Sequence, residues 1–265
     1  MNRIIVDKEK IILEKVTKKI EVTTIPRKDV FGITKLTINI LKDCELEIDY
    51  NIDNCKLDII INVMDGVKFN LYEYKEGSKG KIQYTFNLLN NSFLCIDKFS
   101  IVNNIKEMII VNLSGEKATI DYNFKSISSS KCTYDIVVNH DVCNTISNIK
   151  NNSVNIEDGK TNFQVSGYVD NGIKGCVINQ NNRIINLTNN KCEIRPNLYI
   201  NEYDTIANHS ALIGGFNNDE LFYLQSRGIN EVDANKLLIH GFLISDLSNK
   251  KMIKKIESSI KEYWR

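Results

Sequence analysis

Histidine and cysteine are the residue types in this sequence best suited to binding a metal ion, and one pair of them is closely spaced. His140 and Cys143 lie three residues apart, which could bring an imidazole and a thiol together in a turn. Both groups are ligands for zinc and iron. Because a free cysteine is more often buried than reactive, we expect this pair to be a strand end beside a buried thiol.

The other two histidines, His209 and His240, have different surroundings. His209 follows a strand-like segment at residues 198–206 and precedes Gly214, so the sequence places it at a transition between elements. Functional residues concentrate in such connecting segments. His209 is therefore the candidate functional histidine, with a hydrogen-bonded structural histidine as the alternative. His240 lies among apolar residues of an expected helix, where we expect it to pack.

Common catalytic and cofactor motifs are missing from the sequence. The seven cysteines are odd in number and none are spaced as Cys-x-x-Cys, so neither complete disulfide pairing nor a zinc site of standard spacing is expected. The sequence has no P-loop, no dinucleotide-binding glycine motif, and no zinc-protease or serine-hydrolase motif. These absences argue against several large enzyme classes.

Charge and hydropathy narrow the choice of partners and compartment. The 34 basic and 33 acidic residues give a net charge of +1, so nothing favours nucleic acid or an anionic membrane as a partner. No apolar run approaches the roughly 20 residues of a membrane helix. Charged residues interrupt the first 15 positions, which is unlike a signal peptide. We therefore expect a cytoplasmic location.

Most of the chain shows the alternation of apolar and polar residues that is typical of β-strands. The runs begin about every ten positions and are separated by turns rich in Asn, Asp, Gly and Ser. They lie at residues 36–40, 46–52, 57–63, 67–71, 82–88, 120–124, 134–138 and 163–165. A sandwich, a barrel and a β-helix all fit this pattern. The ends of a solenoid need covering, and a helical C-terminus could supply one such cover.

Three regions are expected from these patterns. Residues 1–30 form an N-terminal segment that could be a short helix or a strand, residues 31–214 form the β-rich core, and residues 215–265 are helical. Asn217 or Asn218 can cap a first helix and Asn230 a second. Gly228 suits the left-handed stop between the two helices. Apolar residues expected to face a core are Leu221, Phe222, Leu224, Val232, Leu237, Leu238, Phe242 and Leu243.

The segment from Pro196 to Leu243 resembles the SufB/SufD family of scaffold subunits for iron–sulfur cluster assembly. Weaker similarity extends the likeness to roughly residues 35–247. The positions in register with the family pattern are Pro196, Leu198, Ile200, Asp204, His209, Ala211, Gly214, Leu221, Phe222, Tyr223, Leu224, Ser226, Arg227, Gly228, Ile229, Ala234, Leu237, Leu238, Gly241 and Phe242.

The resemblance implies a mainly β fold, a right-handed parallel β-helix followed by C-terminal helices, and no catalytic activity. SufB and SufD pair through their β-helices, their C-terminal helices dock the ATPase SufC, and a nascent cluster forms between them on a SufB cysteine and a SufD histidine. It implies no stably bound cofactor, only a transient iron–sulfur cluster at a subunit interface. His209 is the implied iron ligand. The implied docking residues are Phe222, Tyr223, Arg227, Leu237, Leu238 and Phe242.

The departures from the family pattern favour a SufD-like chain. Ala207 stands where the family has a cysteine, Ser210 where it has a glycine, and Tyr199 where it has a glutamate. Cluster iron is usually held by thiolates, which Ala207 cannot supply. The helical N-terminal domain of full-length members is also missing, which indicates a short form. A homodimer that has lost cluster chemistry, and a β-helix enzyme or binding protein, remain as alternatives.

Overall fold

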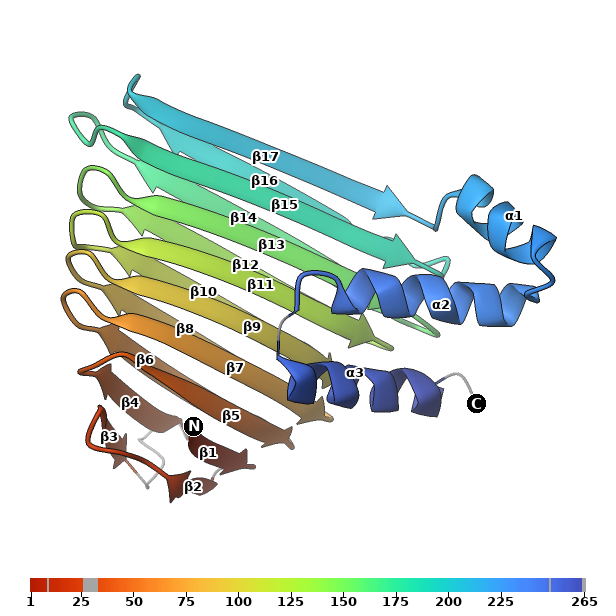
Figure 1. Cartoon of the computed structure of the whole chain (residues 1–265), viewed down its shortest axis with the longest axis horizontal. Coiled ribbons are helices and arrows are strands. Elements are labelled where there is room, and N and C mark those ends of the chain that lie inside the picture. Colours follow the sequence, from red (N-terminus) through yellow and green to blue (C-terminus); the bar gives the residue numbers. More distant parts are fainter. Residues whose placement is uncertain (9, 26–32, 248, 264–265) are drawn as a thin grey trace.

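The chain folds into a two-sheet β-solenoid of about seven turns, followed by helices (Figure 1). The computed structural model describes residues 1–8, 10–25, 33–247 and 249–263. One sheet has nine strands: β1 (Asn2–Asp7), β2 (Lys10–Lys15), β5 (Cys44–Ile52), β7 (Lys68–Gly77), β9 (Phe93–Val102), β11 (Thr119–Ser128), β13 (Ile146–Asn155), β15 (Cys176–Asn186) and β17 (Thr205–Gly214). The other has eight: β3 (Ile20–Ile25), β4 (Thr34–Ile40), β6 (Cys55–Val63), β8 (Gly80–Leu88), β10 (Ile105–Leu113), β12 (Lys131–His140), β14 (Lys160–Val169) and β16 (Glu193–Ile200).

The alternating pattern in the sequence explains the strands. The apolar members of each run point into the solenoid, as Leu46, Ile48 and Tyr50 of β5 do, while their polar neighbours face outward. Successive turns then stack in parallel register, with Leu46 beside Leu71 of β7. The β-helix expected from the family resemblance is confirmed, whereas periodicity alone left three architectures open.

The N-terminal segment consists of strands rather than a helix in its described residues. β1 joins the nine-stranded sheet parallel to β5, while β2 and β3 pair antiparallel at the sheet edges. Residues 26–30 of the segment lie outside the described residues. The exposed edge strand β2 carries Lys10, Glu14 and Lys15. Charged residues on an edge strand discourage another chain from adding to it, although Ile12 and Leu13 of β2 are each 47% exposed.

The interior contains a sealed cluster of charged residues in addition to its apolar core. Glu73, Lys75, Lys98 and Glu107 are all buried. The Lys75 Nζ lies 3.1 Å from Glu73 and 3.5 Å from Glu107, and Lys98 pairs with both carboxylates. The Tyr50 hydroxyl donates to Glu73 at 2.8 Å. Burial lowers the pKa of Lys98 well below its ordinary value, and the nearby ammonium of Lys75 lowers it further.

Asparagine ladders run along the outer faces of both sheets. On the eight-stranded sheet, each side-chain amide donates to the one on the turn below at 2.7–2.9 Å, with 23 to 27 residues separating the partners. The ladder residues are Asn39, Asn62, Asn87, Asn112 and Asn139. On the other sheet, Asn208 donates to Asn179 at 3.1 Å. Stacked amides satisfy each other, which favours one alignment of the turns.

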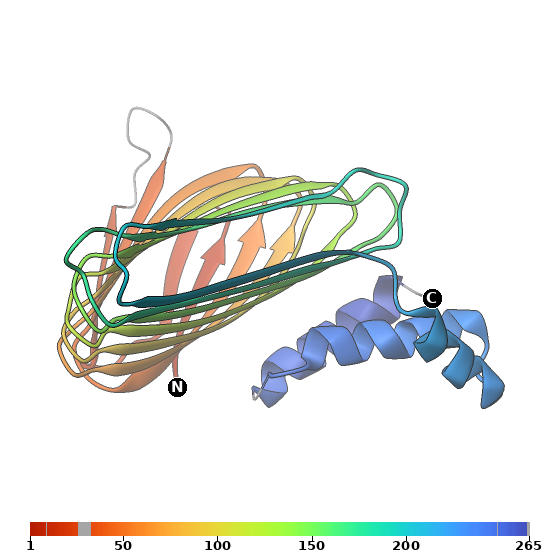
Figure 2. The same ribbon diagram turned by 90° about the horizontal axis from the view of Figure 1, so that it is seen from above.

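The helices lie beside the solenoid, not across its end. α2 (Glu231–Ile244) and α3 (Lys250–Tyr263) run along the outer face of the nine-stranded sheet, whereas α1 (Asn218–Ser226) lies past the end of β17 and contacts α2 (Figures 1 and 2). The expectation that they cover the end of the solenoid is therefore wrong. The cause is an apolar stripe on the outer face of the sheet, which packs against both α2 and α3. The residues in this second core include Phe99, Ile127, Val154, Ile185, Ile239, Leu243, Met252, Ile256 and Ile260.

The ends of the helices follow the sequence signals. Asn217 caps α1 by accepting from the backbone N–H of Asp219, and Asn230 caps α2 by accepting from that of Asp233. Gly228 has a φ of +85°, the left-handed conformation that glycine adopts without strain. None of the helices in the described ranges is both long and apolar enough to cross a membrane.

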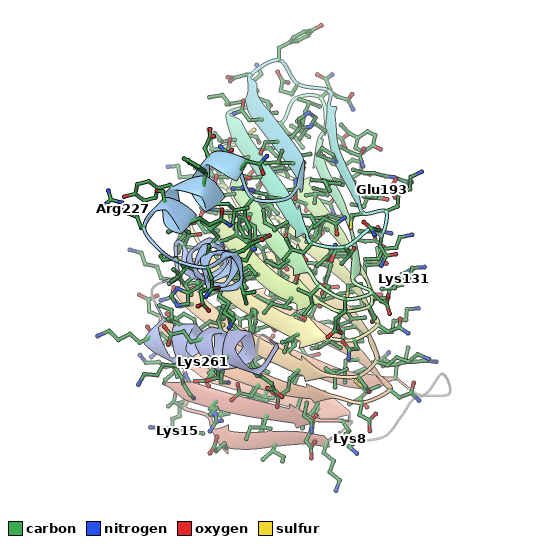
Figure 3. The ribbon with its side chains drawn as sticks, turned by 90° about the vertical axis from the view of Figure 1, so that its right-hand side faces the viewer. Lys8, Lys15, Lys131, Glu193, Arg227 and Lys261 are labelled. Atoms are coloured by element: carbon green, nitrogen blue, oxygen red, sulfur yellow. The ribbon has the colours of Figure 1, made fainter. Side chains whose placement is uncertain are left out.

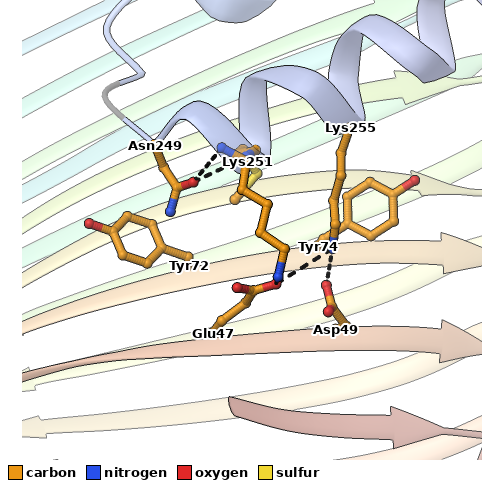
Figure 4. A pocket seen from close by; sticks show the side chains of 8 residues that line it. Glu47, Asp49, Tyr72, Tyr74, Asn249, Lys251 and Lys255 are labelled. Atoms are coloured by element: carbon orange, nitrogen blue, oxygen red, sulfur yellow. Dashed lines mark hydrogen bonds and ion pairs between the residues drawn. The ribbon is translucent and has the colours of Figure 1, made fainter. Parts of the chain in front are cut away.

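α3 is anchored to the first turns of the solenoid by charge (Figure 4). Lys251 forms an ion pair with Glu47, and Lys255 with Asp49. The Lys255 ammonium also lies 4.2 Å from the ring centroid of Tyr74. These contacts join residues about 200 positions apart in the sequence.

Candidate functional site at the open end of the solenoid

The C-terminal end of the solenoid is open, in contrast to the N-terminal end. β16 and β17 are the last strands of their sheets, and no described strand pairs beyond them. Figure 2 looks down on this end and shows it uncovered by the helices. The ten residues of β17 include no Asp, Glu, Lys or Arg. β16 is better protected, because Glu193, Arg195 and Pro196 lie on it.

Apolar side chains are exposed along this bare edge. Ile206 is 62% exposed and Leu212 is 54% exposed, and Tyr203, in the turn before β17, is fully exposed. Natural proteins usually protect a long edge strand with charge, proline or a covering segment. A ten-residue uncharged edge with exposed apolar groups has the features of a surface that another strand covers.

His209 lies in the middle of β17. The expectation that it marks a transition between elements is wrong, because β16 ends at Ile200 and β17 runs from Thr205 to Gly214. It pairs in parallel register with Gln180 of β15, which points into the solenoid. His209 therefore occupies an inward-facing position, and it is exposed because no further turn lies above it.

Two buried amides lie on the strand beneath this edge. Gln180 donates from Nε2 to the backbone oxygen of Asn197 at 3.3 Å, and Asn182 donates from Nδ2 to that of Ser210 at 3.3 Å. Both side chains are almost completely buried. The sequence analysis did not select these residues as functional. Gln180 and Asn182 are inward-facing polar residues on a strand whose other inward-facing residues are apolar, which was the available signal.

Ala207 occupies the inward-facing position two residues before His209. It is paired with Ile178 of β15 and packs in a small apolar cluster with Leu198 and Ile200. Its methyl group offers no metal ligand. Among the described residues, no group of three or more His, Cys, Asp or Glu side chains is arranged to hold a metal ion.

His140 is a buried structural histidine at the end of β12. Its Nδ1 lies 2.7 Å from the Thr145 hydroxyl and its Nε2 lies 2.9 Å from the Ser147 hydroxyl. Burial lowers the pKa of His140 to about 4. Cys143 is half-buried and its sulfur accepts the backbone N–H of Lys174 at 3.3 Å. The pair is thus a strand end held by hydroxyl groups, although the thiol is less buried than expected.

The docking candidates separate into exposed and packed residues. Phe222, Tyr223 and Leu237 are 72%, 58% and 51% exposed. Arg227, just after α1, projects away from the solenoid (Figure 3), with its guanidinium 5.3 Å from the ring centroid of Tyr223. Leu238 is only partly exposed.

Phe242 and His240 face the rest of the protein. Phe242 packs on the second core, with the Arg183 guanidinium 5.3 Å from its ring centroid. His240 Nε2 lies 3.2 Å from a carboxylate oxygen of Glu257, which joins α2 to α3.

The predicted core face of α2 was partly wrong. Leu243 is buried as expected, but Val232 and Leu237 are exposed, and the other buried residues are Ala234 and Ile239. Apolar residues occur on every side of this helix, so its sequence does not indicate which side faces the sheet. The same holds for α1, where Phe222 was expected in the core and is exposed.

Comparison with known proteins identifies a family match over more than half of the chain. A family model described as SUF system FeS cluster assembly, SufBD core domain, matches residues 100–242. SufD from Bacillus subtilis is 34% identical over 82 residues, covering 31% of this chain and 19% of that protein. A SufBD family protein from Mycobacterium leprae is 43% identical over 63 residues, covering 23% and 16%.

SufD from Escherichia coli is 38% identical over 50 residues, covering 19% of this chain and 12% of that protein. The matched stretches thus span less than a fifth of these relatives. The matched region of the family model contains the last turns of the solenoid, α1 and most of α2. It ends before α3, which begins at Lys250.

Proposed function

The chain belongs to the SufBD family of the SUF iron–sulfur cluster assembly system, and on that premise we propose that it is a SufD-like, non-catalytic scaffold subunit. It pairs with a SufB-like subunit through the open end of its solenoid. It binds a SufC-like ATPase through α1 and the exposed side of α2.

The bare edge strand β17 is the observation that carries this proposal. An exposed edge offers a row of unpaired backbone N–H and C=O groups, which another strand can satisfy. The edge strand at the other end, β2, carries the charged residues Lys10, Glu14 and Lys15, whereas β17 carries none, and this difference supports pairing at β17. A second solenoid presenting its own last turn would cover the backbone groups and the inward-facing Ile213, which is 42% exposed in the free chain.

The residue types exposed on the helices support an ATPase-binding role. Phe222, Tyr223 and Arg227 are exposed at α1, with Arg227 beside the ring of Tyr223, and Leu237 is exposed on α2. Aromatic residues and arginine are enriched in the centres of protein interfaces and among the residues that dominate binding energy. These are also the positions at which the sequence resembles the ATPase-docking tail of the family.

His209 is the proposed contribution of this chain to cluster assembly, with the cluster as cargo rather than a resident cofactor. Its imidazole lies on the edge strand that would meet the partner, so it could bind iron at that interface. Because Ala207 supplies no thiolate, the partner must provide the sulfur ligand. The competing arrangement is a pair of two copies of this chain, in which neither edge supplies a thiolate.

Pairing is tested by mixing this chain with a SufB-like subunit and measuring the mass of the complex by light scattering. Ala211→Lys places a charge at an inward-facing position of β17 that is exposed in the free chain and buried on pairing. We expect it to abolish the complex, whereas the matched variant Ile12→Lys on β2 leaves it intact. Equal association of both variants, or a complex of this chain only with itself, would contradict the proposal.

A further inference from the structure

A buried oxygen without a partner lies beside His209. Gln180 is 3% exposed, and its Oε1 accepts no hydrogen bond within the described structure. Its Nε2 reaches the backbone oxygen of Asn197 on β16, the last strand of the opposite sheet. The amide of Gln180 therefore extends to the level of the last turn, where His209 lies on β17.

The orientation of this amide follows from its one hydrogen bond. Turning it over would place Oε1 against the carbonyl oxygen of Asn197, so the nitrogen must face that strand. The amide lies against Gly167, which has no side chain at this point; a Cβ there would lie 3.4 Å from Gln180 Nε2. A buried acceptor left without a donor costs about 1–3 kcal/mol, so it calls for an explanation.

We infer that Gln180 is a positioning residue for His209. When the imidazole turns toward it, Oε1 accepts one ring N–H, which fixes the tautomer and leaves the other nitrogen facing the open end. Residues in register on neighbouring strands are about 4.8 Å apart, which is within reach of these two side chains. Histidines that bind metals usually donate their second N–H to a fixed acceptor of this kind.

The inference rests on the proposed function only for the use of the outward-facing nitrogen. The proposed hydrogen bond joins two residues of this chain and needs no iron, so it is tested first without iron. The tautomer of His209 is read from long-range ¹H–¹⁵N spectra of the full chain at about pH 8.5, where an imidazole is neutral. His209→Asn assigns the signals, and the wild type is expected to show one tautomer.

Substitutions at Gln180 then separate positioning from packing. Gln180→Met keeps the volume and removes the acceptor, so His209 is expected to become a mixture of tautomers. Gln180→Glu keeps an acceptor and should retain the single tautomer. Asn182→Ala, which alters the neighbouring buried amide, is the matched control and should leave His209 unchanged. The same mixture in the wild type and in Gln180→Met would overturn the inference. If Gln180→Met does not fold, a tautomer mixture in the wild type alone overturns it.

Iron binding distinguishes this inference from the proposed function. In an anaerobic Fe(II) titration of the chain with its SufB-like partner, Gln180→Met is expected to weaken binding about 10- to 100-fold, with recovery in Gln180→Glu. If His209→Ala binds iron as the wild type does while the tautomer still depends on Gln180, the positioning role stands and the iron-ligand role of His209 fails. Unaltered iron binding and an unaltered tautomer in Gln180→Met reject both.

Discussion

Replacing Glu107 with leucine should be among the most destabilising single substitutions in this protein. Glu107 is one of two carboxylates that neutralise the buried ammonium groups of Lys75 and Lys98. Without it, two lysines share Glu73 in an interior that water does not reach. Removing one partner of a buried ion pair typically costs about 3–5 kcal/mol. That is a large part of the 5–15 kcal/mol by which a domain is usually stable.

The double variant Lys98→Met with Glu107→Leu tests whether the loss comes from the unpaired charge. It leaves Lys75 paired with Glu73 at 3.1 Å, so most of the stability should return. Each variant is measured by guanidinium unfolding followed by circular dichroism. In Glu107→Leu, the unfolded chain binds more protons than the fold does below the ordinary pKa of lysine. Its stability should therefore rise with pH toward about 10.5.

Two results would refute this reasoning. One is a loss below about 1 kcal/mol in Glu107→Leu, which would mean that the cluster is hydrated or rearranges. The other is a double variant whose loss equals the sum of the two single losses, since charge pairing predicts strong non-additivity. Glu45→Leu, which removes an exposed carboxylate from the outer face of β5, is the control and should change stability by no more than about 0.5 kcal/mol.

Three further predictions follow from the described contacts. As the pH falls, His140 becomes protonated in the unfolded chain at a higher pH than in the folded protein. The free energy of unfolding should therefore fall by about 3 kcal/mol between pH 6.5 and about pH 4. This loss should be absent from His140→Asn when thermal unfolding is measured as a function of pH. Tyr223→Ala should weaken ATPase binding at least tenfold in calorimetry without changing the unfolding midpoint, whereas Leu243→Ala should lower the midpoint by losing about 2–5 kcal/mol of packing. Lys255→Ala removes the contacts with Asp49 and Tyr74, so amide hydrogen exchange should become faster in α3 and stay unchanged in β13. The same exchange rate in α3 of the variant and the wild type would contradict the anchoring role.

Strands such as β6 could be predicted from the sequence because their inward residues are apolar at every second position. On β6, every second residue faces the interior of the solenoid, as a period of two requires: Leu57, Ile59, Ile61 and Val63. β13 was not among the predicted runs, and its buried residues include the polar Asn151 and Ser153. The architecture needed the family resemblance, since alternation is the same in a sandwich or a barrel. Residues 1–30 were ambiguous because β2 is mostly exposed. Its apolar residues, Ile11 to Leu13, are consecutive and do not alternate with polar residues.

The candidate site was predicted less well than the fold. His209 was identified, but its position in mid-strand was not, because Asn208 and Ser210 look like loop residues when the strand pairing is unknown. Gln180 could not be connected to it, since 29 residues separate two positions that only the stacking of turns brings together. The placement of α2 and α3 depends on an outer apolar stripe that includes Phe99 on β9 and Ile127 on β11. These residues interrupt the polar outward pattern of two strands that are neighbours in the sheet but are 28 residues apart in the sequence.

The difference between the two ends of the solenoid sets a limit on assembly size. A stack of identical turns with two bare ends would accept a new copy at each end and grow into a fibre. Here the end formed by β2 and β3 is antiparallel and β2 carries charged residues, which disfavours the addition of another parallel turn, whereas β17 is uncharged. If two chains meet at their open ends as proposed, the ends left outside are those formed by β2 and β3, and the proposed assembly would stop at a pair of solenoids.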